Sequence, residues 1–149
     1  MPQACRRFTG LLLLAGLLLS VSEAVLAQSG LWRVASLNLC TDQLLLALAD
    51  RSQIASLSRL ARDPSLSFMA EDAFGFRLND GGVEPLLFDR PDLILAGTYG
   101  QQEQAALLKR QGFEVLSLGS WSSLEDGRGQ IRSLAYRLGH PERLSLIHI

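Results

Sequence analysis

Strand-like apolar segments alternate with segments of helical spacing from residue 33 onward in this 149-residue chain. The strand-like segments are residues 33–37, 53–57, 93–96 and 114–118. Helical spacing predicts helices at residues 42–49, 83–88, 101–111 and 123–138. Residues 58–82 are polar and rich in glycine, so we expect mostly loop there. Strands that alternate with helices form a parallel sheet with right-handed crossovers. The sequence therefore predicts an α/β fold with a four-stranded parallel sheet and flanking helices.

The boundaries of the predicted helices carry residues that commonly begin and end helices. Thr41 is placed to cap the first helix, and Ser123 with Asp126 three residues later is close to a capping box. Gly112 and Gly139 stand where glycine commonly ends a helix. These signals support the order of elements predicted from the apolar spacing.

The N-terminal segment has the three parts of a secretory signal peptide. Arg6 and Arg7 supply positive charge, and residues 11–21 form an almost unbroken apolar run. Small residues at a cleavage site follow at 25–27. The apolar run is too short for a membrane-spanning helix, which needs about 20 residues, although a retained membrane anchor is the alternative. We expect residues 1–27 to be a signal peptide that directs the protein to the periplasm.

Charge and cysteine content narrow the classes of function. The formal net charge is −1 at pH 7, which argues against nucleic acid as a partner. Cys40 is the only cysteine after the predicted signal peptide, so that part of the chain cannot form an internal disulfide. The length supports one compact domain, which we place at residues 28–140.

Polar and aromatic residues follow the carboxyl ends of the predicted strands, where open parallel sheets bind their ligands. The candidate ligand-binding residues are Asn38, Leu39, Cys40, Arg59, Thr98, Tyr99 and Trp121. This set suits a large, flat, partly polar ligand better than a phosphate. The sequence also contains no glycine-rich phosphate loop, no dinucleotide fingerprint and no serine elbow.

Some of these candidates have simpler interpretations. Burial is the commoner fate of a free cysteine, so Cys40 can instead be a small buried residue. Arg59 can be a solvated loop charge, and Tyr99 can be ordinary loop packing. His140 is the only histidine outside the final six residues, and we expect it to lie solvated beside a helix end. We therefore predict no direct metal site, no cofactor and no catalytic residue.

Four stretches resemble, in order, the class III periplasmic binding proteins of ABC transporters, which bind iron-siderophores and cobalamin. The stretches are residues 33–41, 83–95, 108–115 and 123–139. The second is similar to the most recognisable part of that family: a glutamate at Glu84, a short helix, Pro91-Asp92 and a hydrophobic strand. The chain departs from the family after the first strand, where residues 38–40 replace the usual Ser-Pro.

The resemblance implies two Rossmann-like lobes joined by one long helix, with the ligand clamped between the lobes. It identifies this chain as the N-terminal lobe and places the start of the interlobe helix at residues 141–149. Residues 144–149 resemble the translation of a sequencing adapter, so we expect them to be adapter-derived. We also expect residues 1–27 and 144–149 to pack poorly against the domain.

The resemblance also implies a function and a docking residue. In the family, a glutamate on each lobe pairs with arginines of the membrane permease, and Glu84 matches the position on the first lobe. The same carboxylate can also stabilise a helix N-terminus through the helix dipole. The implied function is the substrate-binding component of an ABC importer, which delivers an iron-siderophore or cobalamin to a permease and its ATPase. The alternatives are a binder of heme or another chelate, a small periplasmic Rossmann-like enzyme, and a truncated fragment without function.

Overall fold

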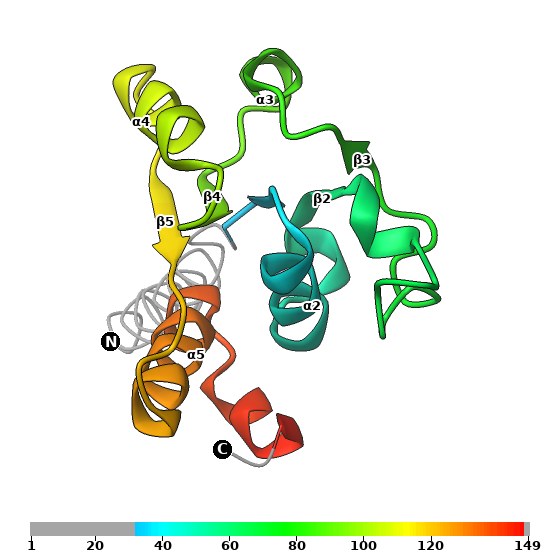
Figure 1. Cartoon of the computed structure of the whole chain (residues 1–149). Coiled ribbons are helices and arrows are strands. Elements are labelled where there is room, and N and C mark those ends of the chain that lie inside the picture. The colour runs from blue at the N-terminus through cyan, green and yellow to red at the C-terminus, as the bar shows by residue number, and fades with distance from the viewer. Residues whose placement is uncertain (1–31, 148–149) are drawn as a thin grey trace, which may run out of the picture. The chain divides into compact units, whose positions relative to one another are not determined.

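Five parallel strands form the sheet of the computed structural model, which describes residues 32–147. The strands are β1 (Val34–Ser36), β2 (Ile54–Ser58), β3 (Leu78–Asn79), β4 (Leu93–Gly97) and β5 (Val115–Leu118). Their order across the sheet is β3-β2-β1-β4-β5, and every neighbouring pair is parallel (Figure 1). The predicted α/β class and parallel sheet are confirmed. The predicted number of strands is wrong, because β3 lies in a segment that the sequence predicts as loop. The predicted signal peptide lies outside the described residues.

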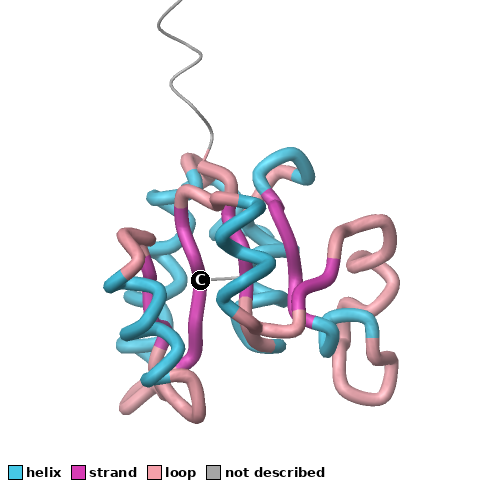
Figure 2. The backbone as a smooth tube through the Cα atoms, turned by 90° about the horizontal axis from the view of Figure 1, so that it is seen from above, coloured by secondary structure: helices cyan, strands magenta, loops and turns pink. Residues whose placement is uncertain are grey.

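Helices cover both faces of this sheet, as predicted. The α-helices are α2 (Leu39–Leu48), α3 (Val83–Asp89), α4 (Gln102–Arg110) and α5 (Leu124–Leu138). Short 3-10 helices are η2 (Arg51–Gln53), η3 (Arg59–Arg62) and η4 (Pro141–Ile147). Helices α2 and α5 pack on one face and α3 and α4 on the other, and Figure 2 shows the strands between these two layers. Among the described residues, no helix is long and apolar enough to cross a membrane.

The two central strands send alternate side chains into two separate hydrophobic clusters. Val34 of β1 and Leu93 of β4 belong to the cluster under α2 and α5. Ala35 of β1 and Ile94 of β4 belong to the cluster under α3 and α4. Successive side chains of a strand point to opposite faces, so a sheet covered on both sides favours apolar residues at successive positions. This is why β4 reads as an apolar run in the sequence, while the buried Ser36 of β1 has its hydroxyl 2.7 Å from Thr41 Oγ1.

The strand missing from the sequence prediction, β3, is short, and one of its two side chains makes buried hydrogen bonds to the neighbouring strands. Its pairing with β2 covers only two positions, with Leu57 opposite Leu78 and Ser58 opposite Asn79. The Asn79 amide donates to the Ser36 carbonyl oxygen and to Ser56 Oγ, both at 2.9 Å. A two-residue strand is too short to show any periodicity, so only these long-range contacts reveal it.

The segment after α5 folds back onto the domain. Gly139 ends α5 with a φ of 82°, as predicted. The His140 side chain is only 14% exposed, with Nε2 3.0 Å from Gln53 Oε1 and Nδ1 3.1 Å from Glu142 Oε1. The expectation of a solvated histidine is therefore wrong, because η2 and η4 enclose the ring from both sides. Leu144 packs against the α2 cluster, contrary to the poor packing expected for it.

Candidate ligand-binding site

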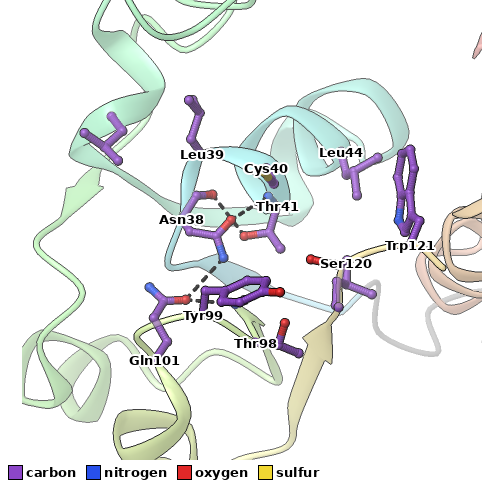
Figure 3. A pocket seen from close by; sticks show the side chains of 14 residues that line it. Asn38, Leu39, Cys40, Thr41, Leu44, Thr98, Tyr99, Gln101, Ser120 and Trp121 are labelled. Atoms are coloured by element: carbon purple, nitrogen blue, oxygen red, sulfur yellow. Dashed lines mark hydrogen bonds between the residues drawn. The ribbon is translucent and has the colours of Figure 1, made fainter.

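The carboxyl ends of β1, β4 and β5 surround a pocket of about 550 Å³. Side chains from the start of α2 and from the loops after β4 and β5 converge on it (Figure 3). The lining residues are Asn38, Leu39, Cys40, Thr41, Leu44, Leu60, Gly97, Thr98, Tyr99, Gln101, Leu118, Gly119, Ser120 and Trp121. The pocket therefore occupies the edge of the sheet at which open parallel sheets bind ligands.

The structure brings together all of the predicted ligand-binding residues except one. Asn38, Tyr99 and Trp121 meet at the pocket although they follow three different strands. Arg59 also follows the carboxyl end of its strand, but it is exposed and does not line the pocket. Its neighbour Leu60 lines the pocket instead, from the 3-10 turn of η3. The role of these residues in binding stays a prediction.

Asn38, and not Thr41, caps the helix that forms one wall of the pocket. The Asn38 Oδ1 atom accepts from the Thr41 backbone N–H at 3.0 Å, so α2 begins at Leu39, earlier than predicted. The Thr41 hydroxyl donates to the Asn38 carbonyl oxygen at 3.0 Å and lies 2.7 Å from Ser36 Oγ. Both Asn and Thr are good caps, so the sequence alone left two possible starts for this helix.

Cys40 lies exposed in the first turn of α2 and lines the pocket. The interpretation of Cys40 as a buried residue is therefore wrong. Cys40 is the second residue of α2, and its side chain lies on the exposed side of the first helical turn. The neighbouring Thr41 and Asp42 are the buried residues of that turn.

Gln101 joins the two loops that form the floor of the pocket, and the sequence analysis missed this role. Its Nε2 donates to the Leu37 carbonyl oxygen at 2.8 Å. Its Oε1 accepts from the Gly97 N–H at 2.8 Å and from Asn38 Nδ2 at 3.2 Å. A Cβ added to Gly97 would stand 2.6 Å from Asn38 Nδ2, so any larger residue would displace the Asn38 amide from this position. No local signal marks Gln101, which reads as an ordinary residue at a helix start.

Trp121 lies against the first turns of α5. Ser123 caps this helix as predicted, with its side chain accepting from the Asp126 N–H at 3.1 Å. A Cβ added to the buried Gly127 would stand 2.6 Å from Trp121 Cδ2. The glycine therefore leaves room for the indole ring, which remains 54% exposed and lines the pocket.

A buried carboxyl group lies behind the α2 wall. Asp42 Oδ1 accepts from the Ser58 N–H at 2.9 Å, and Asp42 Oδ2 accepts from the Ser58 hydroxyl. Burial raises the pKa of Asp42, and hydrogen bonds from Ser36 and Ser58 oppose this effect more weakly. The group joins α2 to the end of β2 and does not line the pocket.

Glu84 lies on the surface, away from this pocket. It is exposed in the first turn of α3, as predicted, while Leu86 is fully buried. Val83 packs against the cluster under α3 and α4, also as predicted. The expectation that Leu87 faces the core is wrong, because this short helix leaves it 43% exposed. Among the described residues, no group of three or more His, Cys, Asp or Glu side chains could hold a metal ion.

The fold is shared with solved periplasmic binding proteins. The vitamin B12 binding protein BtuF of Vibrio cholerae matches at a TM-score of 0.58 and 23% identity, over 74% of this chain and 43% of that protein. A heme-binding protein from Pseudomonas aeruginosa matches at 0.58 and 21% identity, over 77% of this chain and 41% of that protein. The siderophore-binding protein FhuD from Vibrio cholerae matches at a TM-score of 0.54 and 22% identity, over 78% of this chain and 46% of that protein.

The chain spans less than half of the length of each of these three proteins. No protein-family model matches the sequence, and no curated protein matches it significantly. At these identities the similarity establishes the fold, and it confirms the family resemblance at that level. Residues 32–147 therefore have the α/β fold of one lobe of class III periplasmic binding proteins, the cobalamin, heme and siderophore type.

Proposed function

We propose that this chain is part of the substrate-binding component of an ABC importer, which captures a metal chelate in the periplasm. The observation that carries the proposal is the pocket at the carboxyl edge of a sheet whose fold is shared with chelate-binding proteins. The proposed ligands are an iron-siderophore or a corrinoid, and heme is an equally supported alternative. A second lobe would close over the pocket, and the predicted signal peptide would export the protein.

The pocket favours binding over catalysis. The potential nucleophiles of the lining are Cys40, Thr41, Thr98, Tyr99 and Ser120, but the described residues that line the pocket include no histidine and no carboxylate that could activate them. An enzyme of the acyl-transfer or hydrolase type needs a nucleophile and a base within hydrogen-bond reach. The alternative of a small periplasmic enzyme therefore has less support than a binding protein.

Titration of the purified chain with metal chelates tests the proposal. The probes are cyanocobalamin, iron(III) protoporphyrin IX and ferric desferrioxamine, and the signal is the quenching of Trp121 fluorescence in a Trp32→Phe background. We expect saturable quenching by at least one chelate. Tyr99→Ala should weaken this binding, because Tyr99 and Trp121 line the same pocket. Absence of saturable binding by every probe would refute the proposal.

A second experiment tests the proposed docking role of Glu84. Exposed ion pairs contribute roughly 0–1 kcal/mol to stability, so Glu84→Ala should leave folding and ligand affinity nearly unchanged. Across an interface, charge complementarity mainly speeds and orients association, so the same change should weaken permease docking and uptake. Glu103→Ala, an exposed acid in the first turn of α4, is the matched control. In a two-lobed protein that also lacks the matching glutamate of its second lobe, uptake at the unmodified rate would contradict the docking role.

A further inference from the structure

The pocket carries no formal charge on any of its lining side chains. Within residues 32–147, none of the residues that line it is Asp, Glu, Lys, Arg or His. The Arg59 guanidinium, the cation predicted for this edge, is exposed outside the lining. The nearby Asp42 carboxyl is directed to Ser58 and is buried behind α2. A ligand with a highly charged face would therefore lose hydration here without gaining an opposite charge.

The amide side chains of the lining are already used within the protein. Asn38 binds the Thr41 N–H and Gln101, and Gln101 also binds the Leu37 carbonyl oxygen and the Gly97 N–H. These bonds hold the loop after β1 against the loop after β4. These bonds are part-buried, so removing them to bind a ligand would leave polar groups without partners in a partly desolvated site, which is unfavourable. The amides therefore act as a frame for the pocket.

The remaining surface is aliphatic and aromatic, with a few hydroxyl groups. The apolar lining consists of Leu39, Leu44, Leu60, Leu118, Tyr99 and Trp121. Tyr99 is 79% exposed and Trp121 is 54% exposed, although both are large rings at the same pocket. Burial of apolar area contributes about 25 cal/mol per Å², and aromatic rings stack favourably on flat conjugated systems. Thr98 and Ser120 add neutral hydroxyl groups at the pocket.

We infer that this pocket receives the flat, uncharged face of a tetrapyrrole macrocycle, in preference to an anionic catecholate siderophore. The inference rests on the proposed function and narrows the class of chelate. The apolar face of the ring would lie against the leucines and between the two exposed aromatic rings. The charged or amide groups at the rim of the macrocycle would remain at the open mouth of the pocket. A porphyrin and a corrin share this chemistry, so the experiment separates them.

The test compares three probes on the same purified chain: iron(III) protoporphyrin IX, cyanocobalamin and a ferric tris-catecholate. Dissociation constants are measured by the quenching of Trp121 fluorescence in the Trp32→Phe background. At least one tetrapyrrole should bind about tenfold or more tightly than the catecholate, which corresponds to about 1.4 kcal/mol. Comparison of the two tetrapyrroles shows whether the pocket prefers a porphyrin or a corrin.

A charge placed in the pocket tests the physical cause. Leu60→Lys adds a cation to the lining at a residue that is already 45% exposed, so folding should persist. The affinity for the tighter tetrapyrrole relative to the affinity for the catecholate should then fall about tenfold. Leu107→Lys is the matched control, because Leu107 is 38% exposed on α4 and does not line the pocket. Leu39→Lys serves as a second pocket variant if Leu60→Lys does not fold.

The outcomes separate the inference from the proposed function. If the catecholate binds as tightly as both tetrapyrroles, or more tightly, the inference is wrong while chelate binding stands. If Leu107→Lys shifts the ratio as much as Leu60→Lys, the tetrapyrrole binds elsewhere, and the inference is again wrong. If no probe binds, the inference and the proposed function both fail.

Discussion

Asp42 shows how one buried side chain connects the pocket wall to the rest of the sheet. Its carboxyl group is fully buried and binds the Ser58 N–H and hydroxyl, so it links the first turn of α2 to the end of β2. An ionised carboxylate is costly in such surroundings, which is why burial raises its pKa from the ordinary 3.8. Burial therefore shifts the protonation equilibrium of Asp42 toward the neutral acid relative to an exposed aspartate, while the hydrogen bonds from Ser58 favour the ionised form.

Asp42→Asn should make the free energy of unfolding less sensitive to rising pH. A pKa that is higher in the folded state gives stability that is present below the unfolded value of 3.8 and is lost as pH rises through the folded value. Asn cannot ionise and keeps an acceptor for Ser58. The free energy of unfolding of Asp42→Asn relative to the unmodified chain should therefore increase with pH and then level off. Urea unfolding at a series of pH values measures this difference.

Asp63→Asn is a control for which the stability relative to the unmodified chain should change with pH in the opposite direction. Hydrogen bonds from the Ser65 side chain and backbone lower the pKa of the half-buried Asp63. Its contribution is present above the unfolded pKa and is lost as pH falls through the lowered folded value. Asp63→Asn should therefore lose stability relative to the unmodified chain as pH rises. A pH-independent difference for Asp42→Asn would show that its ionisation has no effect on folding.

Helix α5 has ordinary capping residues and an apolar core face, and one of its glycines packs closely against a tryptophan ring. Ser123 begins it and Gly139 ends it, while Ile131, Leu134 and Leu138 pack into the core below the sheet. Two glycines in its first turns would ordinarily weaken it by about 1 kcal/mol each. Their surroundings differ, because Gly127 lies under the Trp121 ring, whereas a Cβ added to Gly129 would have nothing within 4 Å.

The two glycines should respond differently to substitution by alanine. Gly129→Ala should stabilise the protein by about 1 kcal/mol through helix propensity alone. Gly127→Ala gains the same propensity, but the new Cβ would stand 2.6 Å from Trp121 Cδ2, so the indole must move. Its fluorescence spectrum and quenching by iodide should then change, measured in a Trp32→Phe background. Identical spectra for the two variants would contradict the packing of Trp121 on α5.

At the scale of the whole molecule, contacts between segments far apart in the sequence hold the C-terminal segment of residues 32–147 against the rest of the domain. Arg143 donates to the Leu48 carbonyl oxygen at 3.1 Å and pairs with Asp50, while His140 lies against Gln53. The hydrogen bond from Arg143 is the main cause that lowers the pKa of Asp50. These contacts hold η4 on the corner between α2 and β2.

Arg143→Gln should release η4 without loosening the sheet. Hydrogen exchange of the backbone amides in residues 141–147 should become faster, while the exchange in β4 stays unchanged. Lowering the pH of the unmodified chain through the lowered pKa of Asp50 should have the same local effect, because protonation removes the charge that Arg143 binds. Arg137→Gln, which breaks the surface pair with Glu114, is the control and should leave η4 protected. Equal exchange in both variants would contradict this role of Arg143.

The sequence alone determined the class of fold, the order of most elements and the edge that carries the pocket. The apolar runs of β1 and β4 and the signals at Ser123 and Gly139 are local, because burial on both faces and helix capping each leave a mark on a few neighbouring residues. The exposure of Glu84 could be predicted in the same way, because its apolar neighbours Val83 and Leu86 mark the side of the helix that faces the core.

Only the tertiary structure decided which side chains hold the pocket together. Asn79 links β3 to Ser36 and Ser56, and Gln101 bridges the loops after β1 and β4. The partners of these amides lie far away in the chain, so no local pattern could identify them. Arg59 follows β2 as predicted, but Leu60 of the 3-10 turn η3 lines the pocket and Arg59 does not. The direction of a side chain in a loop depends on the surrounding packing, which the sequence does not display.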